Sequence, residues 1–345
     1  MKALVTGATG FIGSSLVREL LKDNVEVRVL IRKNSSTNNI DGLDLDKAYG
    51  DIRDKESVKV ALKGCDTFYQ AAALYEYWGH TKKEFYDVNV EGTKSALQAA
   101  LEQGVGKVVY TSSIAALGAH GRDRLAKEDA EFNLWKTGAH YCITKYLGQV
   151  EALKMAQKGL PVVIVNPAGV IGVRDIRPTP SGRLILDVLT KRTPGYMDGG
   201  LNLVDVEDVA RGHILAAKKG RIGEKYILGN ANMSILEFYK LVSDVAGMQP
   251  PKMKFPYPAV LVTSFLYQLI ASVTKRPPPV TPAAARTSRM YMYFDSSKAV
   301  KELGFPQTPI RTTVEKAVNW FRENGYVKAG SSVKHLPCSS GQVCR

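Results

Sequence analysis

The sequence predicts an α/β fold in which a doubly wound parallel sheet is joined by a smaller, mostly helical lobe made from C-terminal insertions. Two observations predict the sheet. Short β-branched runs alternate with longer segments whose apolar residues recur at helical spacing, and the first run leads straight into a glycine-rich turn. A third observation predicts the lobe, because this alternation breaks after Pro167 into Gly-, Pro- and Arg-rich sequence.

Five runs with a clear strand pattern are KALVT (2–6), VEVRVLI (25–31), DTFYQAA (66–72), KVVYTSS (107–113) and PVVIVNP (161–167). A further strand is expected just before Asp51, so that DTFYQAA is the fourth strand of the chain and KVVYTSS the fifth. The main domain then covers residues 1–172, and residues 201–229 return to it. Residues 173–200 and 230–328 are expected to form the lobe. The tail, 329–345, has no periodic apolar face and is expected to be disordered.

The chain carries a large positive charge. Its 47 Lys and Arg residues against 33 Asp and Glu give a formal net charge of +14, and residues 250–345 contribute 14 − 4 = +10 of it. Such an excess attracts phosphate-bearing ligands, nucleic acid or anionic membranes, or it forms a solvated surface. No nucleic-acid-binding motif accompanies it, so we expect a solvated surface and no nucleic-acid partner.

Cysteine usage and the N-terminus favour a cytoplasmic protein. Cys65, Cys142, Cys338 and Cys344 show neither metal-ligand nor disulfide spacing, so reduced thiols and no metal site are expected. Met1 is followed at once by an apolar strand, which leaves no room for a signal peptide.

The turn TGATGFIG (6–13) has the context of a dinucleotide-binding loop. It follows the first strand and opens a helix, as in a Rossmann-type fold, where glycines allow a tight turn and let phosphates reach the helix N-terminus. Its spacing is GxxGxxG rather than GxGxxG. The cofactor contacts expected in this loop are Gly7, Thr9, Gly10, Phe11, Ile12 and Gly13.

The end of the second strand predicts which dinucleotide binds. Where an acid would bind a ribose 2′-hydroxyl, the chain has Arg32 and Lys33; Arg32, helped by Lys33 or Arg28, could neutralise a 2′-phosphate. NADP(H) is therefore the preferred cofactor, with NAD(H) as the alternative if these are only exposed charges. Further cofactor contacts are expected after the third and fourth strands, at Asp51, Ile52, Ala71, Ala72 and Ala73.

The stretch AHYCITKYLG (139–148) places Tyr141 and Lys145 four residues apart, and therefore on one face of a predicted helix. A nearby ammonium lowers the pKa of a phenol from about 10, which would make Tyr141 a general acid/base near neutral pH. Upstream, Ser112 and Ser113 close the fifth strand at the carboxyl edge of the sheet, where ligands of open α/β sheets bind. A hydroxyl there could polarise a substrate carbonyl.

In combination, TGATGFIG, TSS (111–113), YCITK (141–145) and LVDVEDVARGH (203–213) resemble the extended short-chain dehydrogenase/reductases. The resemblance covers roughly residues 1–328. Within the family it points to the dihydroflavonol-reductase-like branch, which includes bacterial hopanoid-associated sugar epimerases.

The resemblance assigns roles to residues. It implies that Tyr141 is the general acid/base, that Lys145 assists it and binds the nicotinamide ribose, and that Ser113, or else Ser112, polarises the carbonyl. It also implies that Asn89 supports the active-site backbone and a proton relay. The cofactor contacts that it implies in this region are Ser112, Tyr141, Lys145 and Pro167.

Two reactions fit these residues. The first is NADP(H)-dependent interconversion of a carbonyl and an alcohol on a small or lipid-like substrate. The alternative is an NAD-dependent sugar-nucleotide epimerase that oxidises and re-reduces its substrate with the same residues. Arg32 favours the reductase, because epimerases of this family that recycle a bound cofactor commonly use NAD. A dinucleotide-sensing protein without turnover is disfavoured, because the Ser, Tyr and Lys are all present.

Two segments bear on substrate and partners. Tyr75 and Trp78 follow the fourth strand and could line an apolar pocket, or pack a loop against the lobe. Residues 255–276 contain a mostly apolar run, Ala259 to Val273, which is too short to span a membrane. It is expected to pack within the lobe or, with basic residues at both ends, to lie on an anionic membrane as a peripheral contact. The resemblance also implies a homodimer through the helices that follow the fourth and fifth strands.

Overall fold

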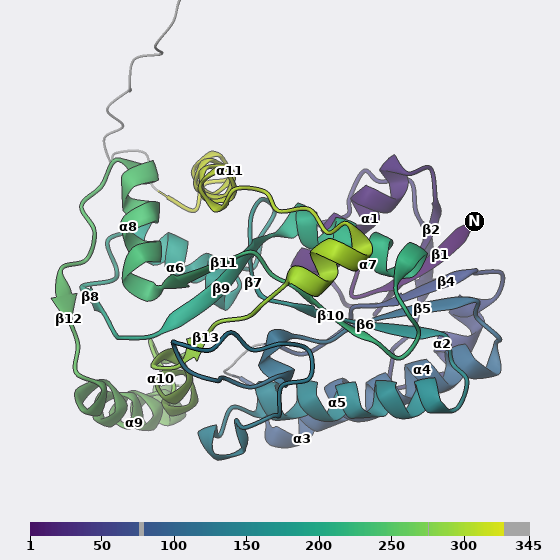
Figure 1. Cartoon of the computed structure of the whole chain (residues 1–345), viewed down its shortest axis with the longest axis horizontal. Coiled ribbons are helices and arrows are strands. Elements are labelled where there is room, and N and C mark those ends of the chain that lie inside the picture. Colours follow the sequence, from purple (N-terminus) through teal and green to yellow (C-terminus); the bar gives the residue numbers. More distant parts are fainter. Residues whose placement is uncertain (76–78, 275, 328–345) are drawn as a thin grey trace, which may run out of the picture.

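The computed structural model describes residues 1–75, 79–274 and 276–327, which form a large parallel sheet between helices with a lobe at one end (Figure 1). In this part of the chain the large sheet has seven strands in the order β10-β6-β5-β4-β1-β2-β3, and all neighbours are parallel. They are β1 (Lys2–Thr6), β2 (Glu26–Ile31), β3 (Asp46–Tyr49), β4 (Thr67–Gln70), β5 (Lys107–Thr111), β6 (Val162–Pro167) and β10 (Lys225–Leu228). The predicted doubly wound parallel sheet is confirmed.

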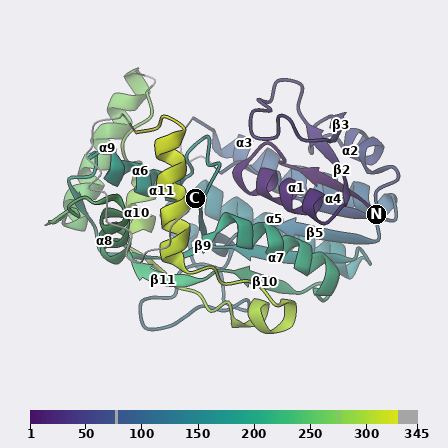
Figure 2. The same cartoon turned by 90° about the horizontal axis from the view of Figure 1, so that it is seen from above.

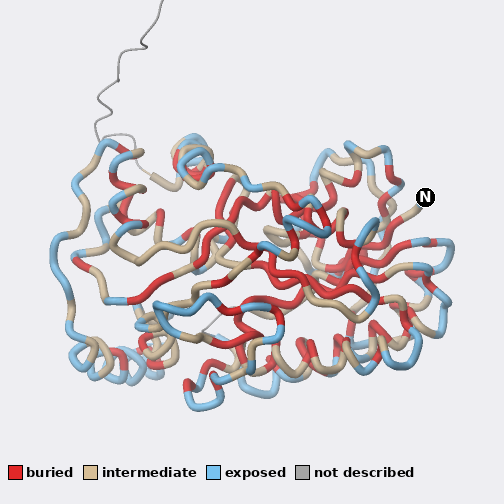
Figure 3. Tube along the Cα trace, viewed as in Figure 1, coloured by how far each residue is buried: buried red, intermediate tan, exposed pale blue. Residues whose placement is uncertain are grey.

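Helices cover both faces of this sheet. Along β1, Ala3 and Val5 pack into one apolar cluster and the intervening Leu4 into another, because successive side chains of a strand point to opposite faces. One face is covered by α1 (Phe11–Lys22) and α7 (Val206–Lys219), and the other by α2 (Lys55–Leu62), α4 (Gly92–Glu102) and α5 (His140–Gln157). Apart from the edge strand β3, whose residues are partly or fully exposed, the strands between these layers are mostly buried (Figure 3).

The lobe lies beside the carboxyl edge of the large sheet, as both views show (Figures 1 and 2). Its small sheet contains β7 (Gly169–Ile171), β9 (Gly200–Asp205), β11 (Ala231–Ser234) and β13 (Tyr291–Met292), and a further pair is β8 (Gly195–Tyr196) with β12 (Met253–Lys254). Its helices are α6 (Pro180–Leu189), α8 (Ile235–Ala246), α9 (Tyr257–Thr274), α10 (Pro282–Ser288) and α11 (Ile310–Glu323). Fully buried Phe238, Val314 and Phe321 join α8 and α11 in one apolar core.

Strand pairing moves two boundaries of the predicted division. β9 pairs with β7, β11 and β13 in the small sheet, so the return to the large sheet begins at α7 rather than at residue 201. Residues 299–305, which were expected to belong to the lobe, pack instead with α7 through Leu303 and Phe305. Both differences involve contacts between segments that are far apart in the sequence. The local periodicity of the sequence does not specify such contacts.

One of the two expectations for residues 255–276 was a helix packed within the lobe. Helix α9 does not meet this expectation. In this fully described helix, Ser264 and Ala271 are the buried side chains, and most of its large apolar side chains are exposed. Its 18 residues also exceed the apolar run seen in the sequence. The predicted tail, 329–345, lies outside the described residues.

Candidate active site

The glycine loop packs tightly against the chain that leaves β4. Gly7 has a φ of +70°, and a Cβ added to it would lie 2.7 Å from the backbone of Ala71 and Ala72. A Cβ on Gly13 would lie 2.1 Å from the carbonyl oxygen of Gly7. Both positions therefore require glycine, and Ala71 and Ala72, which follow β4, lie beside the loop.

The first turn of α1 is suited to hold a diphosphate. Gly10 is its N-cap, and no side chain from the described part of the chain caps the helix. The first backbone N–H groups of a 12-residue helix, with their positive partial charge, therefore remain available to an anion. Thr9, Phe11 and Ile12 occupy this same turn. The φ of Gly10 is −83°, an extended conformation that any residue can adopt. The lack of a side chain at this position therefore lets a ligand approach the backbone closely and does not relieve backbone strain.

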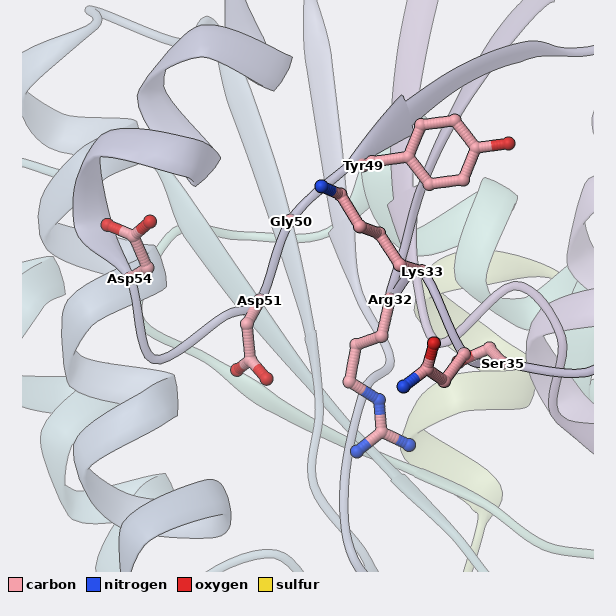
Figure 4. A pocket seen from close by; sticks show the side chains of 8 residues that line it. Arg32, Lys33, Ser35, Tyr49, Gly50, Asp51 and Asp54 are labelled. Carbon is pink, nitrogen blue, oxygen red and sulfur yellow. The ribbon is translucent and has the colours of Figure 1, made fainter.

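The end of β2 forms one wall of a cavity of about 600 Å³ (Figure 4). The cavity is lined by Arg32, Lys33, Asn34, Ser35, Tyr49, Gly50, Asp51 and Asp54. The Arg32 side chain and the Asp51 carboxylate extend to the same side of it. A hydrogen bond from Arg53, opposed by burial, lowers the pKa of Asp51, and the charge of Arg32 adds to this effect. The cavity thus offers both a cation and a carboxylate to an adenosine ribose.

Two residues expected near this cavity have other partners. Arg28 donates from Nε to Asp46 Oδ2 at 2.7 Å and from Nη1 to two backbone carbonyl oxygens, so it does not assist Arg32. The Ile52 side chain is buried, in contact range of Gly92 on α4. In contrast, the guanidinium of Arg32 is exposed and makes no hydrogen bond to any described residue.

Tyr141 and Lys145 lie one turn apart on α5, next to the end of β5. Lys145 is buried, and its Nζ donates to the carbonyl oxygen of Thr111 at 2.6 Å. The Tyr141 phenol shares a hydrogen bond with the Ser113 hydroxyl, and Ser113 Oγ also accepts from the backbone N–H of Ala115 at 3.1 Å. The structure thus brings together the Ser113, Tyr141 and Lys145 that the sequence singled out.

The pKa values of this pair differ from the sequence expectation. Burial around the phenol raises the pKa of Tyr141 to about 12, against a smaller lowering effect of the Ser113 hydrogen bond. Burial also lowers the pKa of Lys145 to about 7. The sequence led us to expect a lowered phenol pKa, and in the protein alone it is raised instead, because desolvation outweighs the lowering by Ser113. Tyr141 is a protonated donor at neutral pH.

Asn89 connects helix α5 to the loop after β4. It lies in the π-helical turn η1 (Asp87–Glu91), which follows α3 (Lys82–Tyr86) and leads into α4. Its Oδ1 accepts from Leu74 N at 2.7 Å, and its Nδ2 donates to Leu74 O at 2.9 Å and to Thr144 Oγ1 at 3.1 Å. A π-helical turn commonly marks a functional site, and here it turns this amide towards α5.

The structure also identifies two polar pairs that the sequence did not. Thr111 Oγ1 lies 2.9 Å from Nε2 of His213 on α7, whose Nδ1 lies 2.7 Å from the carbonyl oxygen of Val209. Because a carbonyl can only accept, Nδ1 carries the proton and Nε2 accepts from Thr111. Asn166, at the end of β6, donates to the Ser113 carbonyl oxygen at 2.8 Å. The signal in the sequence that could have identified His213 is its place at the end of LVDVEDVARGH (203–213).

His213 is expected to make the fold sensitive to acid. Burial lowers the pKa of His213 to about 4 from 6.5, so between these values the unfolded chain binds a proton that the folded chain does not. Stability is therefore lost as pH falls from about 6.5 to about 4, by about 3 kcal/mol for this group. Urea denaturation at several pH values should show a shallower acid slope for His213→Gln than for the unmodified protein.

A matched histidine provides the control for this experiment. His120 is only partly buried and lies 3.0 Å from the carbonyl oxygen of Leu117. His120→Gln should leave the slope unchanged. Equal slopes for the unmodified protein and His213→Gln would show that His213 is not held neutral.

The remaining predicted residues lie around this centre. Ser112 Oγ is buried without a hydrogen-bond partner among the described residues, and Pro167 ends β6. Ala73 and Tyr75 follow β4, on the segment that Asn89 holds through Leu74. Trp78 lies outside the described residues.

Comparison with known proteins decides the family of this site. Residues 3–229 match the model of the NAD dependent epimerase/dehydratase family. The chain belongs to this family. The protein is therefore an NAD(P)-dependent enzyme of the extended short-chain dehydrogenase/reductase type, acting on CH–OH groups.

Three relatives place the chain within the family. It is 39% identical to a putative dihydroflavonol 4-reductase of Synechocystis sp., over 94% of this chain and 95% of the relative. It is 34% identical to sterol demethylase protein B of Methylococcus capsulatus, over 95% of this chain and 100% of the relative. A crystal structure of gox2253, with 39% identity, superposes with a TM-score of 0.84 over 94% of this chain and 99% of that one.

Proposed function

We propose that the protein is an NADP(H)-dependent reductase that interconverts a carbonyl and an alcohol on a small or lipid-like substrate. The observation that carries the cofactor choice is Arg32, exposed at the end of β2 and lining the cavity there without a hydrogen-bonding partner among the described residues. A planar guanidinium binds a phosphate through two parallel hydrogen bonds, whereas a 2′-hydroxyl needs an acceptor at this position.

The residues present fit such a cofactor. The uncapped start of α1 would hold the diphosphate, Arg32 the 2′-phosphate, and Lys145 the ribose next to the nicotinamide. When bound, the nicotinamide supplies or accepts the hydride.

The proton chemistry belongs to this chain. The phenol of Tyr141, neutral because its pKa is about 12, donates its proton to the substrate oxygen during reduction. Ser113 Oγ, held beside Tyr141, donates a hydrogen bond to the same oxygen and stabilises its developing negative charge. Asn89 holds α5 through Thr144, which keeps Tyr141 in place.

Apolar surroundings support a lipid-like substrate. Tyr141 packs on an apolar cluster that includes Leu134 and Cys142, and Met290 from the lobe packs on the same cluster. Leu134 and Met290 also line a second cavity of about 230 Å³. Sterol demethylase protein B, named for a lipid substrate, is among the relatives.

Removal of Arg32 tests the cofactor choice. We expect Arg32→Ala to weaken NADPH binding by about 10- to 100-fold, the loss of a charge-assisted hydrogen bond, and to leave NADH binding nearly unchanged. Calorimetric titration of both dinucleotides measures this. Lys47→Ala, which removes an exposed cation from β3, is the control and should change neither affinity. Equal affinities of the unmodified protein for NADH and NADPH would refute the preference.

The family name favours a second candidate, an NAD-dependent sugar-nucleotide epimerase with the same Ser-Tyr-Lys site. The two reactions differ in how the cofactor is used. A reductase consumes added NADPH in proportion to product, whereas an epimerase turns over with a tightly held NAD and no added cofactor. Identifying the dinucleotide that co-purifies, and its exchange with free NADPH, separates them.

A further inference from the structure

Helix α9 presents a continuous apolar face to solvent. Six large side chains on it, Val262, Phe265, Leu266, Leu269, Ile270 and Val273, are between 51% and 78% exposed. Their spacing of three and four residues places them on one side of the helix. Figure 3 shows α9 at the edge of the lobe, with little of it buried.

The opposite side of α9 packs against the lobe. Ser264 and Ala271, seven residues apart and hence on one line, are buried, and α10 packs against α9. The six exposed side chains occupy a sector of about 140° at 100° per residue, and the sequence places no polar residue in that sector. A soluble surface helix normally has the reverse arrangement, with its polar side outward.

The charges in the sequence segment around α9 have a single sign, and one of them, Lys254, pairs with Asp198 outside this segment at 2.6 Å. Residues 245–294 contain no Asp or Glu, and they contain six Lys or Arg residues. Lys252 precedes the helix and Arg276 follows it, and both are exposed. Arg289 lies 4.4 Å from the ring centroid of Tyr257, at the first turn. An apolar face with cations at both ends matches the acyl region and anionic headgroups of a membrane.

The ends of α9 are fixed to the same lobe. Before it, Met253 of β12 pairs with Gly195 of β8, and after it α10 packs on α9 itself. By length and composition alone α9 could cross a membrane. With both ends tied to one side, it lies along a surface instead, as a shallow apolar contact.

We propose that the outer face of α9 docks the protein on an anionic membrane surface. A second copy of the chain fits this face less well. Two-fold pairing of α9 would bring Lys252 of one copy near Arg276 of the other if the helices are antiparallel, with no acid in 245–294 to offset the repulsion.

Docking through α9 would also bring the active site close to the membrane. Arg286 of α10 donates from Nη1 to the carbonyl oxygen of Thr137 at 3.2 Å, just before the catalytic helix, and lies 5.7 Å from the ring centroid of Phe265 on α9. Ala283 of α10 packs on the same apolar cluster as Tyr141. Delivery of a lipid-like substrate along this path rests on the proposed function; the docking itself does not.

Vesicle flotation of the full chain tests the docking. We expect it to bind phosphatidylglycerol-containing vesicles at about 50 mM salt, and to bind them more weakly as salt screens the flanking cations. Leu266→Gln with Leu269→Gln should lower the partition coefficient about tenfold or more, because two apolar side chains no longer enter the acyl region. Lys252→Gln with Arg276→Gln should lower it on anionic vesicles only.

The control pair has equally exposed apolar residues on another surface. Val60 on α2 and Ile222 after α7 are 61% and 57% exposed, and their double Gln variant should bind as the unmodified protein does. NADPH affinity and thermal denaturation, measured on each variant, show that the fold and the cofactor site are intact. Docking is measured without substrate, so its failure leaves the proposed reaction standing.

Three outcomes would overturn the proposal. The first is no binding to anionic vesicles at low salt. The second is that the α9 double variant and the control double variant lose vesicle binding equally, or that neither of them loses it. The third is a dimer that dissociates when Leu266 and Leu269 are replaced, without vesicle binding, since a second copy would then cover this face.

Discussion

Replacement of Tyr141 by phenylalanine is expected to lower kcat for carbonyl reduction by about 10²- to 10⁴-fold, the usual contribution of a positioned general acid. The ring that packs on the Leu134 cluster is kept, and the lost atom is the Oη that shares a hydrogen bond with Ser113. Dinucleotide affinity should stay within about twofold, because Lys145 and the α1 N-terminus are unchanged. Steady-state kinetics on a carbonyl panel, with NADPH titration of the same sample, measure both quantities.

The control for this variant is its neighbour on α5. Cys142 is buried in the same apolar cluster, and Cys142→Ala should reduce stability slightly without a comparable loss of kcat. If Tyr141→Phe retained most of the activity, the proton donor would have to be another group, and the assignment of this site would fall.

Two alanine substitutions in the glycine loop are expected to separate binding from folding. Gly13→Ala places a Cβ 2.1 Å from the carbonyl oxygen of Gly7 and 2.7 Å from its carbon, both backbone atoms that cannot move aside. We expect a loss of several kcal/mol of stability, about 3 or more, or no soluble protein. Gly10→Ala meets only one atom, at 3.2 Å, with φ at −83°, and should fold normally.

The informative result is the dinucleotide affinity of Gly10→Ala. A Cβ at the N-cap of α1 would occupy the path by which a diphosphate approaches the helix, so we expect affinity to fall at least about tenfold while the melting temperature stays near that of the unmodified protein. A folded Gly10→Ala variant that binds NADPH and NADH normally would place the diphosphate elsewhere.

Local signals in the sequence were enough to predict the sheet and to single out the residues of the proposed site. The alternation of strands and helices and the placement of Tyr141 and Lys145 on one helix face follow from periods of two and 3.6 residues, which can be read from short stretches of sequence. Ser112 and Ser113 were singled out by their place after the fifth strand, and the family resemblance gave the preference for Ser113. These features depend little on how distant segments pack.

Features that depend on long-range packing were missed or misjudged. His213 meets Thr111 across 102 residues of sequence, and nothing local specifies that contact. The pKa of Tyr141 was expected to fall and instead rises to about 12, because the degree of burial is a property of the assembled fold. The exposure of α9 was one of two alternatives that the sequence left open, since an apolar run has the same pattern whether protein or lipid covers it.

The separation between the proposed catalytic residues and the proposed substrate wall has an evolutionary consequence. Tyr141, Lys145 and Ser113 are held by elements of the large sheet, whereas Met290 and Ala283, which pack on the same apolar cluster, come from the lobe. Mutations in the lobe can therefore reshape what the enzyme accepts without disturbing proton transfer. A lineage can acquire new substrates by drift in this half of the gene while purifying selection maintains the other half.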